Sequence, residues 1–271
     1  MIGAIIGDIV GSVYEFDNHR KKEFEFFAED CMFTDDSVMS LAVAKALMET
    51  EKKFPQRGED FYEALRENAI VWMQEIGRMY PFCGYGGRFY EWMFTEDPQP
   101  YNSYGNGSAM RISAVGYMAQ SLEDAKKMSQ MVTEISHNHP EGLKGAEATA
   151  VLIYEARNGK SKEELREIAE EYYDLDFTLE EIRPTYRFNE TCQNTVPQAI
   201  VAFLEAEDFE DGIRNAISVG GDSDTLAAIA GGILEAYYGV PEDLEEGALS
   251  YLDERLKDLY KEWKDYLSKQ V

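Results

Sequence analysis

Apolar residues recur at spacings of three and four along most of the chain, which is the pattern of an α-helix with one buried face. The segments that show it, and are predicted as helices, are residues 37–48, 61–79, 108–118, 146–156, 197–204 and 226–238. The segment LDERLKDLYKEWKDYL predicts an amphipathic surface helix with Leu252, Leu256, Leu259 and Trp263 on one face. Strand-like alternation is nearly absent, and the short aromatic run at 24–27 is isolated. The pattern therefore predicts an all-α fold.

Glycine and proline clusters separate the predicted helices, but none forms a long flexible linker or marks a change in composition. The acidic stretch 161–181 is interpreted as an exposed helix followed by a loop, and not as a domain boundary. With 271 residues, the chain can bury about three quarters of its unfolded surface without a disulfide or metal for stability. One domain is therefore favoured over two.

The balance of charge excludes two classes of partner. The chain has 52 acidic and 26 basic side chains, a formal net charge of −26. Duplex nucleic acid and anionic membranes are bound by clustered Lys and Arg, so neither is expected as a partner. Cys31, Cys83 and Cys192 are odd in number and widely spaced, which favours reduced thiols in the cytoplasm. The apolar start of the chain contains Asp8 and lacks a basic region, which predicts a folded helix and not a signal peptide.

Two acidic clusters precede predicted helices. In the first, Thr34, Asp35 and Asp36 come directly before the helix expected near residue 37, where helix capping alone explains such residues. The second is the segment GGDSDT at 220–225, which holds more carboxylates than a cap needs. Carboxylates so close together repel, and a cation relieves the repulsion. Because the ligands on offer are hard oxygens, magnesium, manganese or calcium is indicated and not zinc.

Two further segments carry candidate chemistry. In the first predicted helix, Asp8, Ser12 and Glu15 are spaced to share one face, while glycines every four residues allow another helix to approach closely. The segment YGNGSAMR at 104–111 places glycines at a helix start, where backbone N–H groups can surround an anion. Arg111 lies one turn further and could pair with phosphate. The histidines of SHNHPEG are more typical of hydrogen bonding at a helix end than of catalysis.

Taken together, these segments resemble the ADP-ribosylglycohydrolase family, which includes the dinitrogenase-reductase-activating glycohydrolases and the ADP-ribosyl-acceptor hydrolases. The pairing of TDD with GGDSDT is highly specific, and the glycine loop and histidine motif support it. The resemblance is carried, in the family's order, by GAIIGDIVGSVYE at 3–15, FTDDSVMSLAVAKAL at 33–47, YGNGSAMR at 104–111, SHNHPEGLKGAEA at 136–148 and SVGGDSDTLAAIAGGILEAYYG at 218–239.

The resemblance implies a compact single domain over residues 1–271, an orthogonal helical bundle with two divalent cations, Mg²⁺ or Mn²⁺, on the floor of a cleft. Glu15 matches the acidic residue that the family places beside the metals. Diphosphate and ribose binding is implied for Gly107, Ser108 and His137, with Arg111 as a further phosphate partner. The implied metal ligands are Thr34, Asp35, Asp36, Asp222, Asp224 and Thr225.

The implied activity is metal-dependent hydrolysis of the ribose C1 bond in an ADP-ribosylated protein or small molecule, which releases ADP-ribose. Asp36 or Glu15 would take the proton of the attacking water, and the sequence leaves this choice open. The alternative is a catalytically silent relative that is structural or only binds ADP-ribose. Retention of all six ligand positions and Glu15 favours the enzyme. An isoprenoid synthase is excluded because no third acid completes a DDxxD motif after Asp36.

The acceptor and the number of subunits stay open. Members that cleave arginine-linked ADP-ribose place a further acidic residue in the central loop region. In this chain that region reads PFCGYGGRFYEWMFTEDP at 81–98. None of Glu91, Glu96 and Asp97 aligns clearly with the role, so the sequence does not choose between arginine, serine and a free small molecule.

Overall fold

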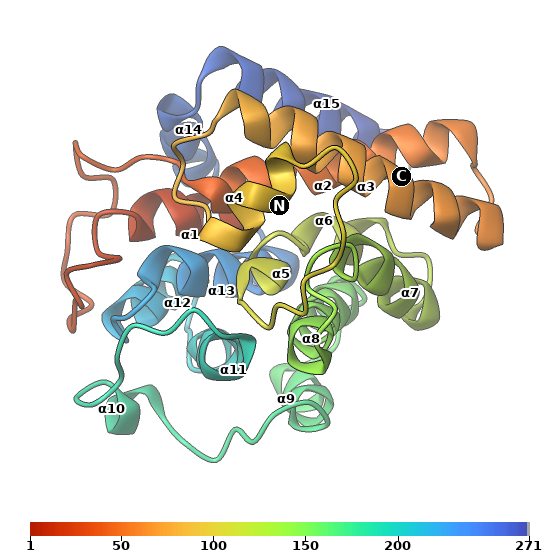
Figure 1. The fold of residues 1–271 in the computed structure, drawn as a ribbon. Helices are drawn as coiled ribbons and strands as arrows, with labels where there is room; N and C mark the ends of the chain where they lie inside the picture. Colours follow the sequence, from red (N-terminus) through yellow and green to blue (C-terminus); the bar gives the residue numbers. More distant parts are fainter. Residues whose placement is uncertain (270–271) are drawn as a thin grey trace.

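The computed structural model describes residues 1–269, and helices make up most of them (Figure 1). This part of the chain contains no strand, and its only β-type contact is an isolated bridge between Gly105 and Thr191. The all-α prediction is confirmed. Residues 270 and 271 of the predicted domain lie outside the described residues. The helices are α1 (Ile2–Gly11), α2 (Asp35–Lys53), α3 (Glu59–Met79), α4 (Gly87–Phe94), α5 (Gly107–Met110), α6 (Ser113–Met118), α7 (Leu122–Thr133), α8 (Pro140–Arg157), α9 (Lys162–Glu170), α10 (Leu179–Ile182), α11 (Cys192–Leu204), α12 (Phe209–Ser218), α13 (Ser223–Tyr238), α14 (Glu242–Tyr251) and α15 (Glu254–Ser268).

Most predicted helices occur, with longer bounds than the apolar period alone gives, but two local predictions are wrong. The segment 108–118 is divided into α5 and α6, because the backbone at Arg111 (φ −91°, ψ 1°) leaves helical geometry. The first helix ends at Gly11, and the hydrogen bond from the Tyr14 N–H to the Gly11 carbonyl forms a turn there. Glu15 therefore lies in a turn beyond α1 and does not share a helix face with Asp8.

The C-terminal helix has the predicted amphipathic character with one change. Leu256 and Trp263 are buried, as expected, and Tyr260 is buried beside them. Leu252 is also buried, but it lies just after α14 and before the first turn of α15. The apolar face of α15 packs on α2.

Helices α1 and α13 form the centre of the molecule, and every residue of α1 is buried. In Figure 1 these two helices lie in the middle, with α14 and α15 at one end of the view and α9, α10 and α11 at the other. A Cβ atom added to Gly7 would lie 2.1 Å from the Ala227 carbonyl oxygen, and one added to Gly3 would lie 2.2 Å from the Gly231 oxygen. The spacing of glycines in α1 thus permits backbone-to-backbone contact with α13. This contact brings Asp8 next to the start of α13.

The buried apolar residues form one continuous cluster that extends from Met1 to Trp263. No helix within residues 1–269 is long and apolar enough to cross a membrane.

Candidate metal centre and active site

A cavity of about 430 Å³ opens where the N-terminal ends of α2, α4, α5 and α13 meet. Its lining includes most of the site residues expected from the sequence. Two opposite kinds of charge line it, and we call them the acidic floor and the basic wall. The acidic floor comprises Glu15, Asp36, Asp222 and Asp224, which line the cavity, and Asp8, which belongs to the same carboxylate cluster but does not line the cavity. The basic wall comprises Arg88, Tyr101, Arg111 and His137.

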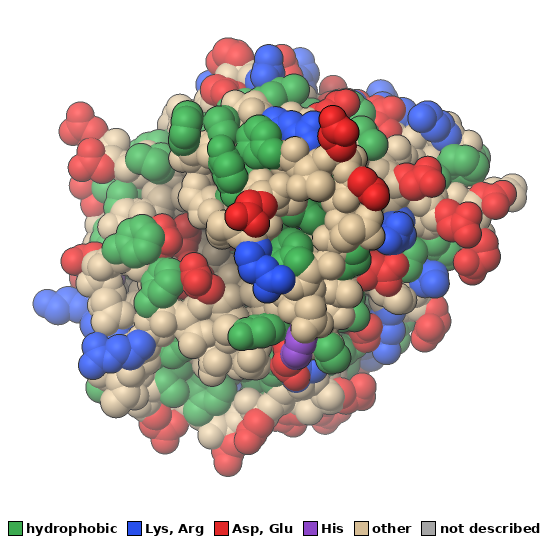
Figure 2. Space-filling model, in the orientation of Figure 1, with side chains coloured by type: hydrophobic (Ala, Val, Ile, Leu, Met, Phe, Trp, Pro, Cys, Tyr) green, Lys and Arg blue, Asp and Glu red, His purple; other side chains and the backbone are tan. Residues whose placement is uncertain are grey.

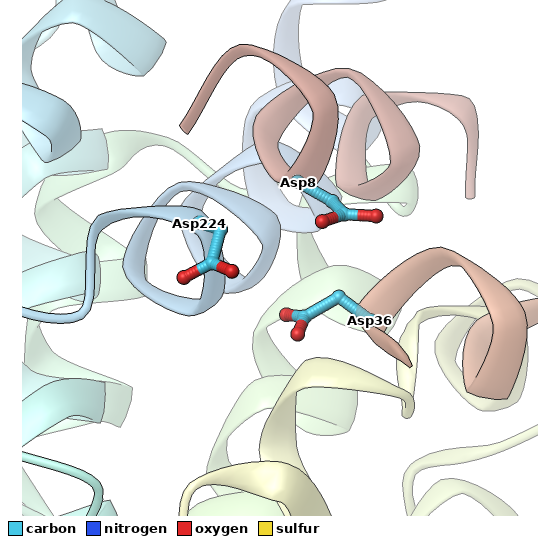
Figure 3. Close-up of side chains that lie close together, drawn as sticks. All are labelled: Asp8, Asp36 and Asp224. Carbon is cyan, nitrogen blue, oxygen red and sulfur yellow. The ribbon is translucent and has the colours of Figure 1, made fainter. Parts of the chain in front are cut away.

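The acidic floor is built from three helices that are far apart in the sequence. Asp8, Asp36 and Asp224 are buried, and oxygen atoms from their carboxylates lie within 4.8 Å of one another. Figure 3 shows these three side chains facing a common point from α1, α2 and α13. Glu15, Asp222 and Asp224 form a second group within the same distance. Asp224 therefore belongs to two adjacent carboxylate groups.

Asp8 joins the end of α1 to the start of α2. Its carboxylate accepts hydrogen bonds from the Thr34 N–H at 2.9 Å, the Thr34 hydroxyl at 2.6 Å and the Ser37 N–H at 3.0 Å, and also from the Ser37 hydroxyl. Because the Thr34 hydroxyl donates its proton to Asp8, its oxygen keeps a lone pair for a ligand. From the sequence, Asp8 was expected in the first helix but was not predicted to be a metal ligand. Its position as an acid within an apolar run was the available signal.

The second acidic cluster is oriented by residues from other segments. Asp222 occupies the N-cap position of α13, but its side chain forms no capping hydrogen bond. Instead, its Oδ2 atom accepts a hydrogen bond of 2.7 Å from the Asn106 amide. The Thr225 hydroxyl donates to Asp36 Oδ2 at 3.3 Å, which links the two predicted clusters directly. Asn106 was not singled out from the sequence, because its role depends on contact with a residue more than a hundred positions away.

Asp35 lies at the edge of this arrangement. It is half-buried and lines the cavity, and its N–H donates to the Cys83 carbonyl at 2.7 Å. Neither carboxylate group includes it. The structure thus brings together Thr34, Asp36, Asp222, Asp224 and Thr225, and leaves Asp35 beside them.

Burial and mutual repulsion raise the pKa values on the acidic floor. Burial raises the pKa of Asp36 well above its usual range, and the charges of Asp224 and Asp8 raise it further. Burial, followed by the charge of Asp222, raises the pKa of Asp224 in the same way. The pKa of Asp222 is raised to about 6, mainly by burial. Burial and then the charges of Asp224 and Asp8 raise the pKa of Glu15 to about 8.

The residues of the acidic floor fit a divalent cation. The Oδ1 atom of Asp36 is buried and has no hydrogen-bond partner within residues 1–269. An unpaired acceptor among repelling carboxylates is costly, and a bound cation removes both penalties. The surrounding donors are carboxylate and hydroxyl oxygens, which suit Mg²⁺ or Mn²⁺ better than zinc.

The basic wall is organised by aromatic rings. The Arg111 guanidinium is 1% exposed and lies 5.1 Å from the centre of the Phe89 ring. It donates to the Ser136 hydroxyl at 2.9 Å and lies 3.4 Å from Nδ1 of His137. Burial, followed by the charges of Arg111 and Arg88, lowers the pKa of His137 well below its usual range. His137 is therefore neutral at physiological pH and can act as a hydrogen-bond partner for a ligand.

The glycine loop and the second histidine occupy different positions. Gly107 begins α5 and lines the cavity, whereas Ser108 is fully buried and does not line it. The Ser108 hydroxyl donates to the Gly142 carbonyl at 2.9 Å. His139 accepts a hydrogen bond from the Glu141 N–H and caps α8, as the sequence predicted for this type of histidine.

Comparisons with known proteins identify relatives over nearly the whole chain. A family model described as ADP-ribosylglycohydrolase matches residues 1–269. The ADP-ribosylhydrolase ARH3 of Homo sapiens is 24% identical and covers 93% of this chain and 88% of its own length. The ADP-ribosyl-[dinitrogen reductase] glycohydrolase of Rhodospirillum rubrum is 24% identical, over 94% of this chain and 90% of its own. The ADP-ribosylarginine hydrolase Tri1 of Pseudomonas putida (strain GB-1) is 25% identical, over 92% and 73% respectively.

A solved structure described as an ADP-ribosylglycohydrolase-related protein complex has the same fold, with a TM-score of 0.63 and 25% identity. The alignment covers 92% of this chain and 95% of that one. The chain belongs to the ADP-ribosylglycohydrolase family, because the family model extends over all but its last two residues. The resemblance found from the motifs is confirmed, and the protein is a glycosidic-bond hydrolase.

Proposed function

We propose that the protein uses two divalent cations, Mg²⁺ or Mn²⁺, to hydrolyse the ribose C1 bond of an ADP-ribosylated acceptor and release ADP-ribose. The observation that carries this proposal is the polarity of one cavity. Carboxylates from the two groups that share Asp224 line the cavity, and so do a buried arginine and a neutral histidine from other segments of the chain. A substrate with a diphosphate next to a ribose matches that polarity.

The acidic floor and its neighbours would hold the cations. When bound, such cations supply positive charge that orients the ribose hydroxyls and acidifies the attacking water. Asp8 is a positioning residue in this proposal, because it accepts hydrogen bonds from Thr34 and fixes the start of α2. The proposed ligands are Thr34, Asp35, Asp36, Asp222, Asp224 and Thr225.

We assign proton transfer from the attacking water to the Glu15 carboxylate, with Asp36 as the other candidate. Glu15 is half-buried and lies in a turn at the cavity lining, where it can reach a substrate. Asp36 is buried at 2% exposure and is held by Thr225 among the other carboxylates, which suits a ligand better than a base. A general base must reach the proton that it accepts, so position decides between the two groups.

Arg111, together with Gly107 and His137, would bind the diphosphate. Arg111 has no carboxylate within 4 Å in the described part of the chain, although it is almost fully buried. A buried charge without a partner is costly, and an anionic ligand supplies the missing partner. Gly107 and His137 line the cavity close to each other, and we propose that they contact the ribose and the diphosphate. Ser108 would act through the loop conformation, since its hydroxyl is occupied by Gly142.

The relatives' names include an arginine hydrolase and an enzyme acting on dinitrogen reductase, so a modified protein side chain is the acceptor that we favour. We further propose that residues 1–271 act as one domain, in the cytoplasm. The continuous buried cluster supports the first point, and three free cysteines are compatible with the second.

The test is an ADP-ribose release assay on arginine-linked, serine-linked and small-molecule substrates, with Mg²⁺, with Mn²⁺ and with EDTA. We expect turnover of at least one substrate that EDTA abolishes and added metal restores. Binding of ADP-ribose without turnover of any substrate would support the silent relative instead. Turnover that EDTA leaves unchanged would refute the metal-dependent mechanism.

A further inference from the structure

Two arginines line the cavity, and they occupy the same wall. Arg111 follows the short helix α5 and is buried, as described above. Arg88 is the second residue of α4, and its side chain is exposed. Arg88 belongs to none of the glycine loops or acidic clusters that predict chemistry in the sequence.

An aromatic residue holds Arg88 in place. Its Nη2 atom donates to the Tyr101 carbonyl oxygen, and its guanidinium lies 4.8 Å from the centre of the Tyr101 ring. Within residues 1–269 no carboxylate lies within 4 Å of it, although acidic residues outnumber basic ones two to one. A guanidinium has five N–H donors in a fixed plane. Stacking on the ring face orients this plane while leaving donors at its edge available.

The two arginines both lie near one histidine, His137. Tyr101 supports Arg88, and Phe89 supports Arg111. The centres of these two rings lie 5.7 Å and 6.2 Å from the centre of the His137 ring. The wall thus carries one buried and one exposed guanidinium. Two guanidinium groups beside one histidine offer separate donors to an anion with two charged groups.

The approach to Arg88 from solvent is open. It follows Gly86 and Gly87, both of which line the cavity. A Cβ atom added to either glycine would have no atom within 4 Å. Figure 2 shows that basic, acidic and hydrophobic side chains are interspersed over one face of the molecule. Arg88 is therefore a solvent-accessible cation at the lining of the cavity.

We infer that Arg88 is a substrate-binding residue that binds one phosphate of a diphosphate, while Arg111 and His137 bind the other. The inference rests on the proposed function, because it assigns a partner within the same cavity. Arg88 forms charge-assisted hydrogen bonds to the outer phosphate, and Tyr101 positions it. The pair of arginines thereby keeps the diphosphate away from the carboxylates of the floor.

Calorimetric titration separates this inference from the proposed function. Inorganic diphosphate in EDTA and at low salt is the first probe, because it requires neither a ribose nor a metal. ADP-ribose with Mg²⁺ is the second. The variants are Arg88→Ala, Arg88→Lys and Arg166→Ala, the last removing an exposed arginine of α9 outside the cavity lining. Circular dichroism and thermal unfolding check that each variant is folded.

We expect Arg88→Ala to weaken diphosphate and ADP-ribose binding by roughly 10- to 100-fold, the loss typical of hydrogen bonds to a charged group. Arg88→Lys should restore only part of the affinity, because lysine lacks the planar fork. Arg166→Ala should bind like the wild type. Equal losses in Arg88→Ala and Arg166→Ala, or no loss in either, would overturn the inference. Arg88-dependent diphosphate binding without ADP-ribose release would support the inference and refute the proposed function.

Discussion

The acidic floor and the basic wall are parts of one cavity, but they are stabilised in opposite ways. On the floor, buried carboxylates face one another and raise one another's pKa values. On the wall, each guanidinium lies against an aromatic ring and has no carboxylate partner in residues 1–269. Like charges therefore repel one another on the floor, whereas on the wall aromatic rings hold the guanidinium groups in position. Removing a carboxylate from the floor should therefore stabilise the metal-free protein, whereas removing a guanidinium from the wall should weaken the binding of an anion.

The largest effect is expected at Asp224, since it belongs to both carboxylate groups. Asp224→Asn keeps the shape of the side chain and removes one of the repelling charges. It should abolish metal binding and lower turnover by at least about 1000-fold, because positive charge at the scissile bond is lost. In EDTA, the same variant should be more stable than the wild type, with a Tm higher by about 2–5 °C.

Metal content by mass spectrometry and thermal unfolding with and without Mg²⁺ measure the two effects. Asp265→Asn, which removes an exposed carboxylate of α15, is the control and should change neither. Wild-type metal content in Asp224→Asn would show that the floor is not the metal site. A lower Tm in EDTA would show that the floor is not strained.

The second effect concerns how the floor is held together. A Cβ atom at Gly7 would lie 2.1 Å from the Ala227 carbonyl oxygen, which belongs to the backbone of α13. Gly7→Ala should therefore separate α1 from α13 and lower the free energy of unfolding by roughly 3 kcal/mol. Denaturant titration measures this change. Gly58→Ala is the matched control, since a Cβ there meets nothing within 4 Å, and it should cost less than about 1 kcal/mol. Equal costs in both variants would contradict the close contact.

The acidic floor and the basic wall also differ in how much of each could be predicted from the sequence. Three acids of the floor, Asp36, Asp222 and Asp224, could be singled out because they occur in two compact motifs at helix starts, and helix starts follow from apolar periodicity. The role of Asp8 could not be predicted, because the groups that donate hydrogen bonds to its carboxylate belong to Thr34 and Ser37, at the start of the next helix. Arg88 carried no signal at all, since its orientation depends on Tyr101 in a later loop.

The errors in the fold have the same physical origin. The apolar periodicity continues through Arg111, but the helix ends there and a second one, α6, follows. The guanidinium of Arg111 is buried against the Phe89 ring at this point. The spacing of Asp8 and Glu15 suited one helix face, but the turn after Gly11 ends α1 first. Local pattern determines where a helix can form. Tertiary contacts decide where it stops, and such contacts are not visible in a single sequence.

The third effect tests whether Asp8 positions the metal ligands of the floor without binding a cation itself. The Ser37 hydroxyl donates to Asp8 and is not a proposed ligand. Ser37→Ala should weaken Mn²⁺ binding by roughly tenfold, which is the usual cost of losing a residue that orients the ligands. Ser40→Ala, one turn along α2, removes a hydroxyl that donates to the Met110 carbonyl and should bind Mn²⁺ within about twofold of the wild type. Titration of Mn²⁺ by electron paramagnetic resonance measures both constants, and an unchanged constant in Ser37→Ala would exclude positioning through Asp8.

The smallest effect on binding is expected at Ser108, where the resemblance and the structure point to different roles. The resemblance implies contact with the diphosphate or ribose, but the hydroxyl is buried and donates to the Gly142 carbonyl. Ser108→Ala should therefore cost about 1 kcal/mol of unfolding free energy, the typical value for one buried hydrogen bond. Its Kd for ADP-ribose should change by less than about threefold, whereas Arg111→Gln should weaken binding by more than about tenfold. A Kd that rises about tenfold in Ser108→Ala, with unfolding unchanged, would place this hydroxyl on the ligand and extend the basic wall to α5.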